Sequence, residues 1–175
     1  RSLAGYDNCP TLIVDMGETF TDILVIKNGV LYVSKSIEFG GGEITALIAK
    51  NLNIGESQAE QFKKDCYLFS FVENKTGKAY NEIRLCEQNL ELEIKKLLSE
   101  FLKKFEGVRV GKVILTGGCS RDSSFFPFFE KSLGVKTFAG NPWGRVIYHQ
   151  EIQSLLGEIA SQFSVAVGAA MKGLE

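Results

Sequence analysis

The sequence has few of the residues that build metal centres, disulfide frameworks and nucleic-acid surfaces. Its 175 residues include one histidine, His149, and four cysteines without Cys-x-x-Cys spacing. A structural zinc site needs clustered thiolate and imidazole ligands, and a disulfide framework is typical of small secreted chains. The formal net charge is −1, whereas a nucleic-acid-binding surface needs a basic excess. We therefore expect reduced thiols in a cytoplasmic protein, without a zinc site or bound nucleic acid.

Proline is also scarce, at three residues, and the 45% hydrophobic content is typical of a globular core. We expect no membrane-spanning segment, because no apolar run reaches the roughly 20 residues that cross a bilayer, and no signal peptide. The length predicts one domain, or one domain with a small insertion. Because the chain begins at Arg1 rather than Met, we expect it to be a piece of a longer protein.

Apolar and turn patterns predict an α/β fold. Asn28-Gly29 joins two β-rich runs, which is a strong hairpin signal. Ser57 is a plausible N-cap for a second helix, and the last helix, rich in alanine and valine, is expected to be tightly packed. The expected strands are 11–14, 22–26, 30–34, 112–115 and 135–138, and the expected helices are 43–52, 57–66, 87–105, 123–133 and 162–172. The predicted order is β-β-β-α-β-α-β-α with a helical insertion.

Two glycine turns, each directly after an apolar strand, are the most informative motifs. In the first turn, Asp15 at a strand end can hold Mg²⁺ through water, Gly17 tightens the turn, and the amides of Glu18 and Thr19 can face phosphates. The alternative is a plain β-turn in which the Asp bonds its own backbone. The residues leave both interpretations open.

The second turn begins at Gly117-Gly118, where bare backbone suits a purine lying flat. It is equally compatible with a simple strand-to-helix connection. Glu60 and Lys63 lie three residues apart on a predicted helix and therefore share a face. The carboxylate can accept ribose hydroxyls and the lysine can reach a base or phosphate, or the two form a surface ion pair.

Taken in order, these motifs resemble the second half of an actin-like ATPase, the superfamily of actin, DnaK, MreB, FtsA and PilM. The resemblance rests on Asp-x-Gly-x-Thr at 15–19, Gly-Gly-Glu-x-Thr at 41–45, Ala-Glu-x-x-Lys at 59–63, Leu-Thr-Gly-Gly-x-Ser-Arg at 115–121 and Ala-Val-Gly-Ala-Ala-Met-Lys-Gly at 166–173. It is strongest toward PilM and FtsA. Gly134-Val135, Asn141-Pro142-Trp143 and Phe163–Gly168 favour the PilM branch.

The resemblance implies a ribonuclease H-like core at 1–39 and 86–175 with a smaller inserted lobe at 40–85. It implies ATP and Mg²⁺ as ligands, with Asp15 on the metal side and Glu18 and Thr19 orienting a water. The implied nucleotide contacts are Asp15, Gly17, Glu18, Thr19, Glu60, Lys63, Gly117, Gly118, Cys119 and Ser120. Phe20 stands where a small hydroxyl residue is common in the chaperones, which predicts weak hydrolysis at most. Nothing before Thr11 matches the first phosphate loop, so we expect half of the cleft to be supplied from elsewhere.

The function that the resemblance implies is a cytoplasmic, nucleotide-dependent scaffold in type IV pilus or related secretion assembly, held at the inner membrane by a PilN-like peptide and capable of self-association. Two alternatives stay open: an FtsA-like cell-division filament protein, which would carry an amphipathic membrane anchor, and an interaction module that has lost nucleotide binding. A sugar kinase on the same fold is less favoured, because its sugar site would come from the other half.

Overall fold

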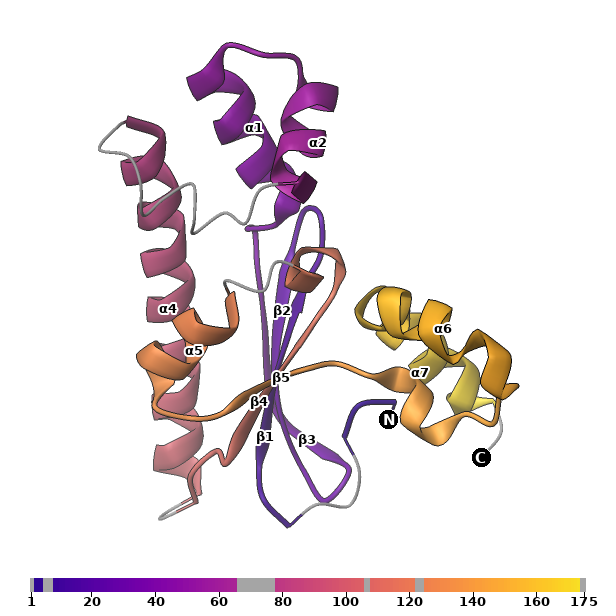
Figure 1. Ribbon diagram of the computed structural model, residues 1–175. Helices are drawn as coiled ribbons and strands as arrows, with labels where there is room; N and C mark the ends of the chain where they lie inside the picture. The colour runs from indigo at the N-terminus through magenta and orange to yellow at the C-terminus, as the bar shows by residue number, and fades with distance from the viewer. Residues whose placement is uncertain (1, 5–7, 66–77, 106–107, 122–124, 174–175) are drawn as a thin grey trace.

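Five strands form one mixed sheet in the order β3-β2-β1-β4-β5 (Figure 1). The computed structural model describes residues 2–4, 8–65, 78–105, 108–121 and 125–173. The strands are β1 (Thr11–Met16), β2 (Thr21–Lys27), β3 (Val30–Ile37), β4 (Lys112–Thr116) and β5 (Thr137–Ala139). β1, β2 and β3 pair antiparallel, whereas β4 is parallel to both β1 and β5. The α/β prediction is confirmed, and because β1 and β4 are parallel, the turns that follow them meet at one edge of the sheet.

The hairpin predicted from Asn28-Gly29 is confirmed. Asn28 has φ of 51° and Gly29 has φ of 72°, and the strands on either side pair Lys27 with Val30. Two central residues with positive φ are the requirement of a type I′ turn, whose twist matches that of the flanking strands. This turn sets the pairing next to it, and the register of β2 against β3 then shifts between Val25 and Ile26.

One face of the sheet carries the main core. Alternate residues of the central strands, Leu12, Val14 and Met16, are fully buried because side chains in a strand point to opposite faces in turn. Helices α4 (Lys78–Lys104) and α5 (Phe125–Leu133) cover this face (Figure 1). Their buried contributions are Leu90, Ile94, Leu97, Phe101, Phe125 and Phe129. Full burial of each such side chain stabilises the fold by about 1.5–3 kcal/mol. Because Leu90, Ile94, Leu97 and Phe101 are buried, the predicted packing of the apolar face of α4 on the sheet is confirmed.

The opposite face has a smaller cover made by the N-terminal residues and the last helices. Ile13 and Ile114 are buried there against Ala4. The hydroxyl of Ser2 donates to the carbonyl of Ser164 at 2.8 Å, which ties the N-terminal segment to the start of α7 (Ser164–Lys172). The N-terminal segment and α7 therefore lie on the same side of the sheet (Figure 1).

Helices α1 (Gly41–Leu52) and α2 (Glu56–Asp65) pack together beyond one end of the sheet (Figure 1), and we call this pair of helices the small lobe. The expectation that Ser57 caps α2 was wrong, because Ser57 lies inside the helix. Gly55 takes that place: its carbonyl accepts the first helical bond, from Ala59 N–H at 2.9 Å, and its N–H donates to the side chain of Gln58 at 3.3 Å. A glutamine three residues after the cap reaches back in the same way in a capping box.

Helix α4 begins at Lys78, nine residues before the predicted start at Glu87. Its first turns lack a clear apolar stripe because they pack on α1 through polar groups, such as the amide of Asn51, which donates to Glu82 at 3.1 Å. The irregular stretch expected at 68–79 lies mostly outside the described residues.

The C-terminal region differs most from prediction. Residues 150–163, largely unassigned from sequence, form η3 (Gln150–Ile152), α6 (Gln153–Ile159) and η4 (Ala160–Phe163), short helices that precede α7. Taken as one stretch, Gln150–Lys172 is long and apolar enough to cross a membrane by length and composition alone, so the expectation of no such stretch was wrong. It was missed because its apolar residues are not consecutive.

Helix α7 is not tightly packed. Val165 is 68% exposed, and 11% of the most apolar window in this stretch is buried. The prediction of tight packing failed because alanine- and valine-rich composition reports a tendency to be buried, but not whether a covering surface is present in the chain.

Candidate functional site

A pocket of about 1090 Å³ opens at the edge of the sheet where the turns after β1 and β4 meet the small lobe. Its walls come from the first turn, the starts of α1 and α5, one side of α2 and the second turn. The lining residues are Gly17, Glu18, Gly41, Gly42, Ile44, Thr45, Ala46, Glu56, Ser57, Glu60, Lys63, Lys64, Asp65, Gly118, Cys119, Arg121, Phe125 and Gln162. The carboxyl edge of parallel strands is the usual ligand site of open α/β sheets.

The structure brings together most, but not all, of the predicted site residues. Gly17, Glu18, Glu60, Lys63, Gly118 and Cys119 line the pocket. Asp15, Thr19, Gly117 and Ser120 do not; they lie in the two turns behind or beside it. Sequence reasoning also left the pocket residues Gly41, Gly42 and Thr45 without a role, although the Gly-Gly-Glu-x-Thr pattern was a signal for them.

The first turn is fastened to the start of α1. The N–H of Gly17 donates to the carbonyl of Phe20 at 3.0 Å, which closes the turn. The carbonyls of Gly17 and Glu18 then accept bonds from the N–H groups of Gly41 and Gly42, at 3.0 and 2.8 Å. A side chain on Gly40, which precedes α1, would clash with the Glu18 carbonyl. The contact between loop and helix therefore depends on bare backbone.

Asp15 lies behind this turn, in a position that disfavours its ionised form. On the sheet it is flanked by Asp22 of β2 and Thr116 of β4. Burial raises the pKa of Asp15, and the charge of Asp22 raises it further. Asp22 itself accepts a hydrogen bond from the hydroxyl of Ser36 at 2.5 Å. A cation near Asp15 would offset both effects.

Glu60, Lys63 and Thr45 form a hydrogen-bonded cluster on the small-lobe wall. The Nζ of Lys63 lies 2.6 Å from Oε2 of Glu60, and it also donates to Oγ1 of Thr45 at 2.7 Å and to the carbonyl of Gly41 at 2.9 Å. The Lys63 side chain is only 14% exposed. These contacts use all three ammonium hydrogens, so α2 is tied to the first turn of α1.

The charges in this cluster keep Glu60 ionised. Burial alone would raise its pKa, but hydrogen bonds from Lys63 and Thr45, with Lys64 nearby, outweigh burial and lower the pKa to about 2. A carboxylate that is always ionised is a strong acceptor for hydroxyl groups. Glu60 is therefore an ionised acceptor that is already paired with Lys63 and Thr45.

The second turn is closed by a hydrogen bond between Ser120 and Gly117, and it has free space beside Gly118. Gly117 has φ of +88°, and a Cβ there would clash with the carbonyl of Met16 and lie 2.6 Å from Oδ1 of Asp15. Ser120 is buried, and its hydroxyl donates to the Gly117 carbonyl at 2.8 Å. At Gly118 an added Cβ would meet nothing within 4 Å. Flat backbone therefore faces the pocket there.

Cys119 of the second turn contacts both the first turn and the start of α1. Its Sγ lies 3.4 Å from the Gly17 carbonyl and 2.5 Å from where a Cβ on Gly41 would stand. On the other side of the turn, the N–H of Gly117 donates to the Ser161 carbonyl at 2.9 Å. The second turn thus contacts the first turn, the small lobe and η4. Among the described residues, no three metal-binding side chains of the His, Cys, Asp or Glu type cluster together.

Comparisons with known proteins agree with this fold. The chain matches the solved PilM–PilN type IV pilus biogenesis complex with a TM-score of 0.80 and 23% identity, over 97% of this chain and 47% of that one. It matches the ethanolamine utilization protein EutJ from Carboxydothermus hydrogenoformans with a TM-score of 0.59 and 20% identity, over 90% and 49%. It matches MreB5 of Spiroplasma citri bound to ADP with a TM-score of 0.59 and 19% identity, over 95% and 54%.

These likenesses confirm the actin-like fold, and the chain spans about half the length of each of these structures. A family model described as type IV pilus assembly protein PilM matches residues 4–174, nearly the whole sequence. The chain therefore belongs to the PilM family of type IV pilus assembly proteins.

Proposed function

We propose that this chain supplies one wall of a nucleotide cleft and that its pocket holds the adenosine part of Mg-ATP. The observation that carries the proposal is the convergence of both glycine turns and the small lobe on a single pocket, with open backbone at Gly118. Bare backbone lets a flat ring approach closely. A pocket of this size with a few polar groups on its wall suits a small ligand.

Each part of the nucleotide has a contact under this proposal. The adenine lies against Gly118 and Cys119, with Ser120 holding the turn in shape. The carboxylate of Glu60 accepts the ribose hydroxyls, and Lys63 fixes its orientation and reaches toward the base. These two side chains bond each other and Thr45, so nucleotide binding would replace some of these contacts.

The phosphates would lie at the first turn, where Glu18 and Thr19 are exposed. Their backbone amides come directly after Gly17, whose N–H closes the turn by donating to the Phe20 carbonyl. Asp15 would hold Mg²⁺ through water, since Mg²⁺ usually keeps several waters when carboxylates and phosphates bind it. When bound, the metal neutralises phosphate charge. Glu18 or Thr19 would orient the attacking water. The bulky Phe20, 48% exposed at this turn, is consistent with slow turnover.

The opposite wall of the cleft would come from a second lobe. The region from Ile147 to Val165 exposes large apolar side chains, including Ile152, Leu155 and Phe163. A patch of this kind on a soluble domain marks an interaction surface. We propose that the other half of an actin-like molecule packs here.

We also propose that this chain is divided into a core at 1–39 and 86–175 and a smaller lobe at 40–85.

Membership of the PilM family supports a role in type IV pilus assembly. We propose a cytoplasmic scaffold that is held at the inner membrane through a PilN-like partner, because a similar structure is a PilM–PilN complex. Lobe closure on the nucleotide would then alter partner binding. Phe20 favours the second candidate, an interaction module that keeps the fold without binding nucleotide; the FtsA-like alternative has no support from the family match.

Calorimetry of Mg-ATP with the full-length protein tests the proposal. We expect binding heat that disappears in Gly118→Asp, because the new carboxylate would lie under the base. Gly144→Asp is the matched control: a Cβ there also meets nothing within 4 Å, but Gly144 does not line the pocket. Absence of heat at high nucleotide would sink the ATPase interpretation. Equal affinity of Gly118→Asp and the native protein would show that the adenosine turn is misassigned.

A further inference from the structure

A second concave surface lies far from the nucleotide pocket, between the C-terminal half of α4 and the end of α5. It is a groove of about 430 Å³. It is lined by three leucines, Leu98, Leu102 and Leu133, and by the side chains of Lys95 and Lys103. Leu102 is 40% exposed. Nothing in the proposed nucleotide cycle uses this groove.

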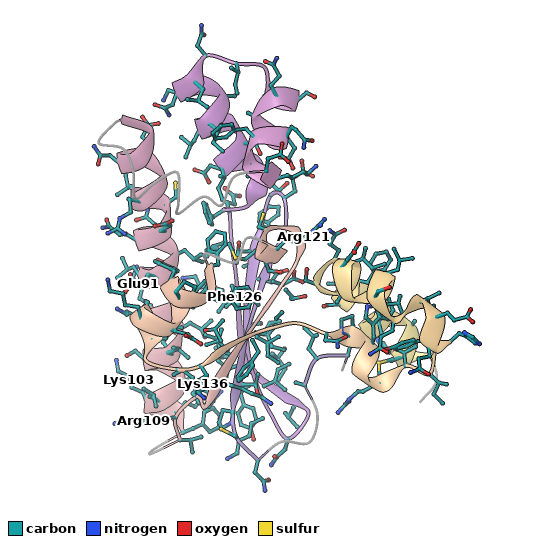
Figure 2. The ribbon with its side chains drawn as sticks, viewed as in Figure 1. Glu91, Lys103, Arg109, Arg121, Phe126 and Lys136 are labelled. Carbon is teal, nitrogen blue, oxygen red and sulfur yellow. The ribbon has the colours of Figure 1, made fainter. Side chains whose placement is uncertain are left out.

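The surroundings of the groove are basic. Lys95 and Lys103 line the groove. On the adjoining described segments the cations are Lys96, Lys104, Arg109, Lys131 and Lys136, and the anions are Glu91, Glu93, Glu100 and Glu130, of which Glu93 pairs with Lys96 at 2.8 Å. Figure 2 shows Lys103, Arg109 and Lys136 toward the same end of the molecule, below Glu91. The whole chain has a net charge of −1, so this end carries a local positive field that the rest of the sequence balances.

The carboxylates of Glu91 and Glu130, which lie near the groove, have partners within this chain. Glu91 pairs with Lys95 one helical turn away, and Glu130 accepts the N–H of Thr137 at 3.0 Å. The Lys95 side chain is 52% exposed, and an exposed ion pair of this type contributes about 0–1 kcal/mol. An incoming carboxylate can therefore take over Lys95 at little cost, and Lys103 is exposed beside the groove.

We propose that this groove is a docking site for an acidic amphipathic peptide segment of a partner protein. Its apolar side chains would enter between Leu98, Leu102 and Leu133, and its Asp or Glu residues would meet Lys95 and Lys103. Helical segments bind grooves in this way, with apolar anchors three or four residues apart. The positive field around the groove increases the rate of encounter with an acidic segment and disfavours basic ones.

A membrane surface fits the same features less well. The groove is shallow, and Leu98 and Leu133 are only partly exposed, so it offers little apolar area to a bilayer. Membrane-binding helices carry a broad apolar face with several large residues, whereas Leu102 is the large apolar side chain that this groove exposes. The small exposed apolar area therefore favours a peptide.

Fluorescence anisotropy with the full-length protein tests the proposal. The probe is a labelled synthetic peptide with leucines at i and i+4 flanked by glutamates, and its comparison is the same peptide with lysines in place of the glutamates. We expect the acidic peptide to bind and the basic one not to bind. Leu102→Ala and Lys103→Glu should each weaken binding about tenfold, the change expected for about 1.4 kcal/mol.

Matched controls come from the far edge of the sheet. Leu31→Ala removes a leucine that is 53% exposed on β3, and Lys27→Glu reverses a charge at the β2 end; neither should change peptide affinity. Thermal unfolding of every variant identifies loss of fold. The proposal is overturned if both peptides bind alike, if the controls weaken binding as much as the groove variants, or if vesicles of anionic phospholipid bind with the same dependence on Leu102 and Lys103 while the acidic peptide does not.

Discussion

The Nζ of Lys63 lies 2.6 Å from Oε2 of Glu60, one turn earlier on α2. This pair is more than a surface ion pair, because the same ammonium also bonds the Gly41 carbonyl and Thr45 on the neighbouring helix. It joins α2 to the start of α1, and the start of α1 is bonded to the first glycine turn. The small lobe and the sheet edge are therefore connected through Lys63.

Replacing Lys63 with methionine should destabilise the fold. The substitution leaves the Gly41 carbonyl, Thr45 and Glu60 without their shared donor, and loss of hydrogen bonds to a charged group costs about 1.5–3 kcal/mol. Urea unfolding measures the change. Lys64→Met is the control, because the Lys64 side chain is 61% exposed and its loss should cost under about 0.5 kcal/mol. Equal effects of the two variants would contradict the structural role of Lys63.

Stability should fall in acid through Glu60. Its folded pKa is lowered to about 2 from an ordinary value of 4.5, so its contribution is complete above about pH 4.5 and is lost as the pH falls from there toward 2. Because the side chain is 37% exposed, solvent screening limits this contribution to about 1 kcal/mol. Unfolding free energies measured at pH 6 and near pH 3 should differ less in Glu60→Gln than in the native protein. An unchanged pH dependence in that variant would rule out this assignment.

Asp15→Asn should raise stability at neutral pH and weaken metal-dependent binding. Burial and the charge of Asp22 raise the pKa of Asp15, so ionised Asp15 opposes folding, and this penalty grows as the pH rises through the raised pKa. A neutral amide removes the penalty but lacks the negative charge that attracts hydrated Mg²⁺. We expect a higher urea midpoint together with about tenfold weaker Mg-ATP binding by calorimetry. Lower stability, or undiminished Mg²⁺ dependence, would show that Asp15 has another role.

Gly117 and Gly118 should respond differently to alanine. Gly117 has φ of +88°, and an added Cβ would clash with Met16, so Gly117→Ala should cost about 1–3 kcal/mol of stability. Gly118 has open space around it, so Gly118→Ala should leave stability within about 0.5 kcal/mol and affect only nucleotide affinity. Thermal unfolding of both variants checks this, and a more destabilising change at Gly118 would be the contrary result.

The 175-residue chain by itself should bind Mg-ATP weakly. The pocket has walls from the two turns and the small lobe, but the surface beyond α6 and α7 is open, so part of a bound nucleotide would stay in water. We expect affinity weaker than about 1 µM, which corresponds to about 8 kcal/mol of binding free energy. Equilibrium dialysis or calorimetry measures it. Sub-micromolar binding would mean that this chain forms the whole site.

The glycine turns could be recognised from sequence because each is a local pattern. A short apolar run that ends in Gly17 or Gly117 specifies a buried strand followed by close backbone, whatever surrounds it. Asn28-Gly29 likewise fixed its hairpin, since the positive φ values belong to the two residues themselves. The roles of Gly41 and Thr45 were harder to see, because their partners lie in the first turn and in α2.

The sequence by itself determined the strands and the hairpin, because these depend on periodicity and on the intrinsic freedom of glycine. Its ordered motifs carried the resemblance to the family, which the family model confirms. Only the tertiary structure decided which candidates share a pocket: Glu60 and Lys63 do, while Asp15 and Ser120 lie behind it. It also decided that Val165 is exposed rather than buried. Burial and proximity arise from contacts between distant segments, and a residue's type states what it can do there but not which surface it will meet.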